Sequence, residues 1–154
     1  MLIEKELEQK FVDALSAMPE LSSWQIVTSR RTTTDDTLVE EDGYNGVIAV
    51  AAGFREHDAF SLTPLNIPVS ISLVTRVEED HTAQKHEAAI ELIVNQLSYW
   101  HKFGGAMQNA LSTTKFTAGE LRMTGGTGRQ YLKEDGVWQD VVNMNIRGAE
   151  IFTN

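Results

Sequence analysis

The sequence predicts an α+β domain with an N-terminal helix and a mostly antiparallel sheet that has one long helix packed across it. Apolar residues recur at spacings of three and four near the N-terminus and again in residues 82–102, as in amphipathic helices. Apolar and polar residues alternate in residues 67–73, as in a strand with one buried face. The expected order is α-β-β-β-α-β-β. A chain of 154 residues is long enough to bury one core, so we expect residues 1–154 to form a single domain.

The first predicted element is an amphipathic helix over residues 2–18. Its expected buried stripe comprises Leu2, Ile3, Leu7, Phe11, Val12, Leu15 and Met18. The charged side chains expected to face water are Glu4, Lys5, Glu6, Glu8 and Lys10. Pro19 ends the helix, because proline cannot continue the hydrogen-bonded turn.

Three predicted strands follow at residues 24–28, 47–54 and 67–77. The second is apolar on both faces and rich in alanine and glycine, which is typical of a closely packed central strand. The third has the clearest alternation of apolar and polar residues. Polar loops are expected at residues 30–43 and 55–66.

A second helix is predicted over residues 82–102, with Asp80 or Thr82 as its N-terminal cap. Its expected buried stripe comprises Ala89, Ile90, Ile93, Val94, Leu97 and Trp100. Glycines at positions 104 and 105 end it, and residues 106–111 form a further helical turn. The last third is a β-hairpin in which residues 120–124 lead through a glycine-rich connection to a strand that begins near Val137.

Charge and composition exclude several classes of protein. Thirteen basic against 22 acidic residues give a formal net charge of −9, which argues against specific nucleic-acid binding and against binding to anionic membranes. The chain has no cysteine, which excludes disulfides, thiol catalysis and cysteine metal sites. We find no signal-peptide pattern and no apolar stretch near the ~20 residues of a membrane span, so we expect a soluble protein made in the cytoplasm.

The motifs that could indicate a cofactor or metal have simpler explanations. Residues 125–128 (Gly-Gly-Thr-Gly) resemble a phosphate loop, but no lysine follows at the required spacing, so a hairpin connection is expected. His81 and His86 are five residues apart, whereas two metal ligands on one helix face are four apart. With His57 and His101 they are expected to be solvated or capping residues. We predict no cofactor and no metal.

No candidate catalytic centre emerges from the remaining residues. The acidic clusters at residues 40–42 and 78–80 lie in predicted turns, where solvent keeps every carboxylate ionised. Tyr99, Trp100 and Trp138 could stack on nucleic-acid bases, but their positions favour core packing. We therefore do not expect an enzyme.

Three segments resemble the tail terminator family of long-tailed bacteriophages (tail-completion, lambda minor tail protein-like). They are the first helix with the strand after it, the strand at residues 67–76 followed by the long helix, and the closing strand at residues 136–146. The resemblance lies in the order of elements and covers most of the chain.

Membership of this family would imply a structural virion protein. Such a protein forms a ring, expected to be a hexamer, that caps the completed tail tube and joins it to the head-side connector. The implied partners are therefore other copies of the chain, the tail tube protein and the connector protein, and the implied location is the virion tail, assembled in the host cytoplasm. An acidic subunit suits a pore through which DNA slides, because like charges repel.

The acidic loop is the predicted protein interface. Its candidate residues are Arg30, Arg31, Asp35, Asp36, Glu40, Glu41 and Asp42. Binding surfaces often lie on loops held by a rigid sheet, and the two arginines could pair with acids of an adjacent subunit. Two alternatives stay open: another head-tail joining, neck or tail tube protein with the same layout, and a small enzyme of unknown chemistry.

Overall fold

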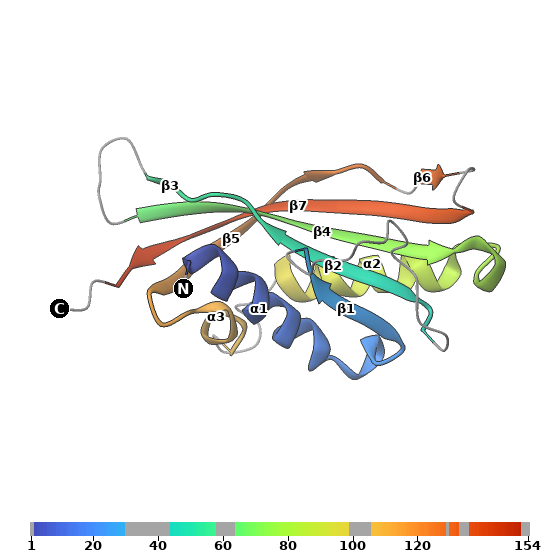
Figure 1. The fold of residues 1–154 in the computed structure, drawn as a ribbon, viewed down its shortest axis with the longest axis horizontal. Coiled ribbons are helices and arrows are strands. Elements are labelled where there is room, and N and C mark those ends of the chain that lie inside the picture. The colour runs from blue at the N-terminus through green and yellow to red at the C-terminus, as the bar shows by residue number, and fades with distance from the viewer. Residues whose placement is uncertain are drawn as a thin grey trace.

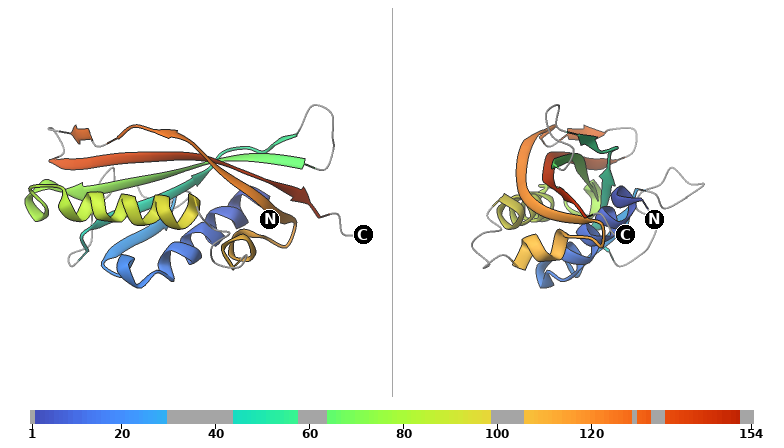
Figure 2. Two further views of the ribbon diagram at one scale, coloured as in Figure 1. Left: turned by 180° about the vertical axis from the view of Figure 1, so that it is seen from behind. Right: turned by 90° about the vertical axis from the view of Figure 1, so that its left-hand side faces the viewer.

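The computed structural model describes residues 2–29, 44–57, 64–98, 106–128, 130–132 and 136–151. Helices cover one side of a strongly twisted sheet (Figures 1 and 2). The helical elements are α1 (Ile3–Ser16), η1 (Pro19–Leu21), η2 (Val77–Glu79), α2 (Gln84–Ser98) and α3 (Ala106–Leu111). The strands are β1 (Trp24–Thr28), β2 (Gly46–Ala52), β3 (Glu56–His57), β4 (Pro64–Arg76), β5 (Phe116–Gly126), β6 (Gln130–Leu132) and β7 (Val137–Glu150).

The sheet is built around two long central strands. β4 and β7 are antiparallel along their whole lengths, from Pro64 opposite Ala149 to Arg76 opposite Val137. The strand order is β1-β2-β4-β7-β5, with β3 beside β4 and β6 beside β7. Only the β1–β2 pair is parallel among the described strands. The predicted α+β class and mostly antiparallel sheet are confirmed.

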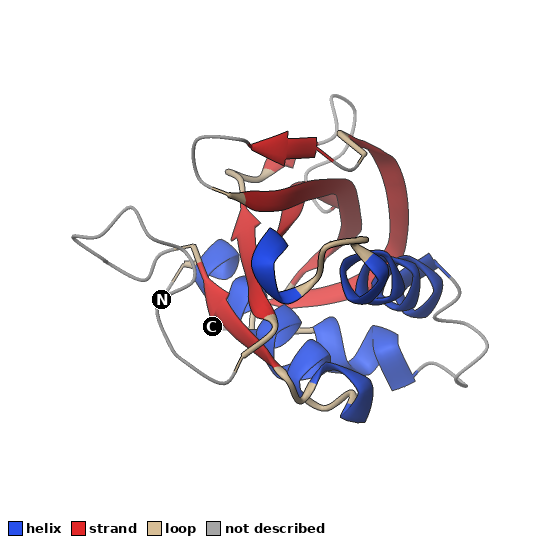
Figure 3. Cartoon of the chain, turned by 90° about the vertical axis from the view of Figure 1, so that its right-hand side faces the viewer, coloured by secondary structure: helices blue, strands red, loops and turns tan. Residues whose placement is uncertain are grey.

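The N-terminal helix and the strands near residues 24, 47, 67 and 137 are present as predicted, with small shifts in their ends. Helices pack against the strands (Figure 3), and α1, α2 and α3 correspond to the predicted N-terminal helix, the predicted long helix and the predicted helical turn at residues 106–111. Within the described residues α2 covers Gln84–Ser98, a shorter span than the predicted 82–102. Its start is set by Ala83, whose φ of 56° is not helical. Trp100 lies outside the described residues.

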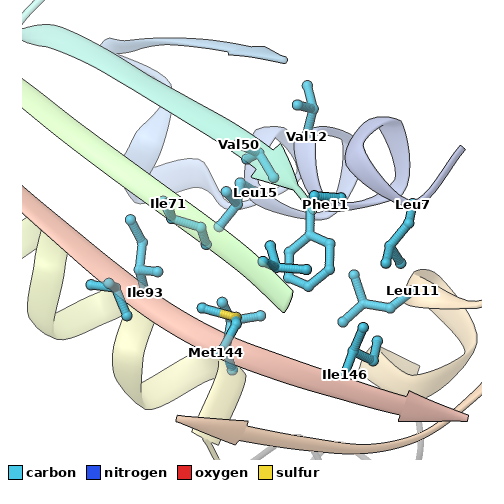
Figure 4. Close-up of a cluster of buried hydrophobic side chains, with 14 of the residues drawn as sticks. Leu7, Phe11, Val12, Leu15, Val50, Ile71, Ile93, Leu111, Met144 and Ile146 are labelled. Carbon is cyan, nitrogen blue, oxygen red and sulfur yellow. The ribbon is translucent and has the colours of Figure 1, made fainter. Parts of the chain in front are cut away.

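The core lies between the helices and the inner face of the sheet (Figure 4). Leu7, Phe11 and Leu15 of α1 are completely buried as predicted, whereas Leu2, also predicted to be buried, precedes the helix and is exposed. They pack in one cluster with Ile71 of β4 and Ile93 of α2. Ile90 and Val94, also predicted to be buried, are half-buried at the margin of α2. Among the helices of the described ranges, none has the length and apolar character that crossing a membrane requires.

Candidate functional site

The predicted interface loop lies outside the described residues. This holds for all seven of its candidates: Arg30, Arg31, Asp35, Asp36, Glu40, Glu41 and Asp42. The structure does fix where the loop is attached. It leaves from Ser29, directly after β1, and returns at Tyr44, two residues before β2. The loop therefore connects the first strand of the sheet to its neighbour.

A buried ion pair holds the first turn of α1. Arg55 donates from Nε and Nη2 to the two carboxylate oxygens of Glu4, at 2.7 and 3.0 Å, and its backbone N–H donates to Glu4 as well. Glu150 of β7 lies 3.8 Å from Arg55 Nη1. Burial alone would raise the pKa of Glu4, but the hydrogen bonds and charge of Arg55 outweigh it, so this pKa lies below 4.5. The same hydrogen bond raises the pKa of Arg55.

The prediction that Glu4 and Glu8 face water is wrong, because each side chain is almost completely buried. Glu8 accepts a hydrogen bond from the backbone N–H of Ala52 at 3.1 Å, at the end of β2. Glu6 stays on the margin and accepts hydrogen bonds from Thr114. Three acids of one helix therefore join α1 to three other segments. The clue in the sequence is that Glu4 and Glu8 fall on one helical line with the buried Val12.

Three exposed apolar side chains are close in sequence to the residues of this ion pair. Leu2, Phe54 and Ile151 are each one or two residues from Glu4, Arg55 or Glu150 in sequence, and Phe54 is 75% exposed. The Arg55 guanidinium lies 5.7 Å from the centroid of the Phe54 ring. We call Leu2, Phe54 and Ile151 the end patch. Large exposed apolar side chains are frequent in protein contacts.

A second buried polar cluster joins α2 to the sheet. His86 is completely buried, with Nδ1 2.7 Å from Thr75 Oγ1 and Nε2 2.7 Å from Asp140 Oδ2. Asp80 accepts a hydrogen bond from the His86 backbone N–H, and its carbonyl accepts one from the Trp138 indole. The prediction of a solvated or capping histidine is therefore wrong for His86. The predicted capping role of Asp80 is confirmed.

Thr75, His86 and Asp140 form a series of hydroxyl, imidazole and carboxylate, as in some hydrolases. Both ring nitrogens of His86 are therefore within hydrogen-bonding distance of a partner, which is Thr75 for Nδ1 and Asp140 for Nε2. The Thr75 hydroxyl, however, is completely buried, and a nucleophile must be reachable by its substrate. The geometry suits a structural link between β4, α2 and β7, because every buried side-chain polar atom of the described residues has a partner.

β1 is an open edge of the sheet, since no described strand pairs with its outer side. Ser29 donates its N–H to the Val50 carbonyl, so by the alternation of a parallel ladder Gln25 and Val27 also bond to β2. The N–H and C=O groups of Trp24, Ile26 and Thr28 then point outward. The strand has no charged residue. A hollow of about 410 Å³ lies along it, lined by Leu21, Trp24, Ile26 and their neighbours.

β5 is the opposite edge, and it is interrupted. Two β-bulges break its pairing with β7, one between Ala118 and Glu120 and one between Met123 and Gly125. The regular stretch between them, residues 120–123, carries the exposed ion pair of Glu120 and Arg122 at 3.2 Å. Bulges and charges limit which strands can pair with an edge and in which register. The predicted hairpin connection follows at Gly128, whose φ of 69° favours glycine.

Two further hollows open on the surface. One of about 370 Å³ lies beside α2, lined by Glu87, Ile90, Glu91, Val94, Asn95 and Asp140. The other, about 270 Å³, lies on the sheet face away from the helices, lined by Glu56, Asn66, Glu120, Arg122, Asn145 and Arg147. Within the described ranges no three histidine or acidic side chains are close enough to hold a metal ion.

No family model matches the chain, and no curated protein matches it in sequence.

Proposed function

We propose that this protein is a structural subunit of a phage tail that assembles as a ring, caps the completed tail tube and meets the head-side connector. The proposal begins from the resemblance in the order of elements. The main structural support is that the two edges of the sheet, β1 and β5 at opposite ends of the strand order, differ from each other. A ring of identical subunits needs two different surfaces on each subunit, one for each neighbour.

The exposed side chains of the end patch offer a further surface for contact. Leu2, Phe54 and Ile151 are 51%, 75% and 39% exposed. Exposed aromatic residues are frequent anchors of protein contacts because they bury a large area when a partner covers them. In the proposed assembly this patch meets the tube or the connector. The net charge of −9 suits a ring around a DNA path.

Tube length tests the proposal. Tail tube protein from the same gene cluster is polymerised with and without this chain, and tubes are measured by electron microscopy. We expect tubes that stop growing, with a ring of added density at one end. Tubes of unchanged length without end density would contradict the proposal. Co-polymerisation along the tube would instead indicate a tube subunit, and binding to the connector alone would indicate a neck protein.

A further inference from the structure

The directions of the two edge strands determine how copies of this chain can join. β1 is parallel to β2, β2 is antiparallel to β4, and β4 and β7 are antiparallel, as are β7 and β5. β1 and β5 therefore run in opposite directions. In a ring whose axis runs along the strands, every subunit has the same orientation relative to that axis. β1 of one subunit then lies antiparallel to β5 of the next.

We propose that copies of this chain join head to tail through a strand pair between β1 of one subunit and residues 120–123 of β5 in the next. This inference deepens the proposed function and rests on it for closure into a ring. The partner is a second copy because the two edges are complementary in direction, in length and in the character of their faces. β1 has five residues, and the regular stretch of β5 has four, with a bulge at each end.

The inner faces of the two edges match. Ile26 of β1 and Leu121 and Met123 of β5 are half-buried hydrophobic residues that pack on the core. Aligning residues 24–27 antiparallel with residues 120–123 places Ile26 opposite Leu121 of the next subunit. Trp24 then lies opposite Met123. The apolar face of one sheet continues into the next, which is what fixes register between strands.

The outer faces match as well. In this alignment Gln25 lies opposite Arg122 of the next subunit, and Val27 lies opposite Glu120. No like charges meet, because β1 is uncharged. The outward N–H and C=O groups of Ile26 gain partners, and the bulges of β5 prevent the pairing from slipping along that strand.

Engineered cysteines test this join directly, because the chain has none of its own. The double variant Gln25→Cys/Arg122→Cys places two cysteines opposite each other across the proposed interface. Both positions face solvent or its margin, so the fold is expected to persist, and melting temperature checks that it does. After oxidation in the presence of tail tube, we expect a ladder of covalent multimers that ends at the size of the ring. Each single variant should give no multimers.

Control variants separate the possible failures. Gln25→Cys/Gln139→Cys, whose second cysteine lies on the inner strand β7, should give no ladder. Dimers from Gln25→Cys alone would mean that β1 pairs with β1, and would contradict the head-to-tail join. If Gln25→Cys/Arg122→Cys forms rings that cap tubes but gives no ladder of cross-linked multimers, the proposed join is contradicted and tube capping is not. A ladder with tubes that keep growing would contradict tube capping and leave the join intact. A monomer under every condition would contradict both.

Proline variants provide a second measurement. Ile26→Pro removes an outward N–H, whereas Val27→Pro removes one that bonds to β2. We expect Ile26→Pro to fold but to lose assembly, and Val27→Pro to melt at a lower temperature than Ile26→Pro. Assembly by Ile26→Pro at the wild-type concentration would overturn the inference.

Discussion

The helix-covered face of the sheet and the edges of the sheet differ in whether their polar groups have partners within the subunit. Under the helices, even charged side chains are buried, and each has a partner: Glu4 with Arg55, and His86 with Asp140. At the β1 edge, backbone groups of Ile26 point outward, and no described strand pairs with them. A buried polar group without a partner costs about 1–3 kcal/mol, so the interior must be complete in the monomer. Water satisfies the edge until another strand replaces it. We therefore expect the first region to determine the stability of the fold, and we propose that assembly depends on the second.

The largest loss of stability is expected from Ile93→Asp. Ile93 is completely buried in the core, and an unpaired carboxylate there costs several kcal/mol. We expect a chain that is unfolded at room temperature by circular dichroism. Ile90→Asp is the control, because Ile90 lies one turn earlier at the half-buried margin and should cost far less. Equal melting of Ile93→Asp and wild type would show that the helix layer is misplaced.

The two ion pairs give the sharpest contrast. Arg55→Ala leaves the buried Glu4 carboxylate without its partner, and we expect a loss of about 2–4 kcal/mol in the free energy of unfolding, since Arg55 is itself partly exposed. Arg122→Ala removes the exposed pair on β5, where both side chains are more than half exposed, and should cost about 0–1 kcal/mol. Denaturant titration measures both. Similar losses would remove the distinction between interior and edge.

Glu4 also predicts a pH dependence. The pKa of Glu4 is lower in the folded state than in the unfolded state. At acidic pH the unfolded state therefore binds more protons than the folded state. The pair stabilises the fold fully at a pH well above the ordinary pKa of a glutamate, and this stabilisation is lost as the pH falls through the lowered pKa of folded Glu4. Stability of Glu4→Gln should therefore fall less steeply than that of wild type as the pH decreases from about 5 to 3. Parallel curves for the two proteins would show that Glu4 is not the group responsible.

Phe54→Ser tests the end patch. Phe54 is 75% exposed, so the free energy of unfolding should change by no more than about 0.5 kcal/mol. The concentration of this chain that is required to cap tubes should rise at least tenfold. Capping at the wild-type concentration would exclude the end patch from the contact with the tube or connector.

The smallest effect on stability is expected in the acidic loop. Replacing Asp35, Asp36, Glu40, Glu41 and Asp42 by asparagine and glutamine should change the unfolding free energy by only a few tenths of a kcal/mol. If this loop contacts a neighbouring subunit or the ring lumen, capping of tails should still be impaired. Normal tail length and normal infectivity of that variant would make the loop a simple connection between β1 and β2.

The fold was predictable where the pattern is local. The stripe of Leu7, Phe11 and Leu15 and the alternation of Ile67 to Leu73 follow from burial of one face, which depends only on spacing. The buried polar groups were not predictable. Glu4 meets Arg55 across 51 residues and His86 meets Asp140 across 54, and no local rule brings such positions together. The sequence also predicted β1 as a strand, but not that it ends the sheet, because strand order depends on long-range pairing.

Hydrogen exchange of single amides in β1 tests the central claim most directly. In the free subunit the Ile26 N–H points outward and should exchange rapidly, whereas the Val27 N–H bonds to β2 and should exchange slowly. In rings assembled on tail tube, we predict that exchange of the Ile26 N–H slows at least tenfold. Exchange of the Val27 N–H should stay slow, so this neighbouring amide is the internal control. Unchanged exchange at Ile26 in the assembled ring would contradict the account, because the β1 edge would then have no partner strand.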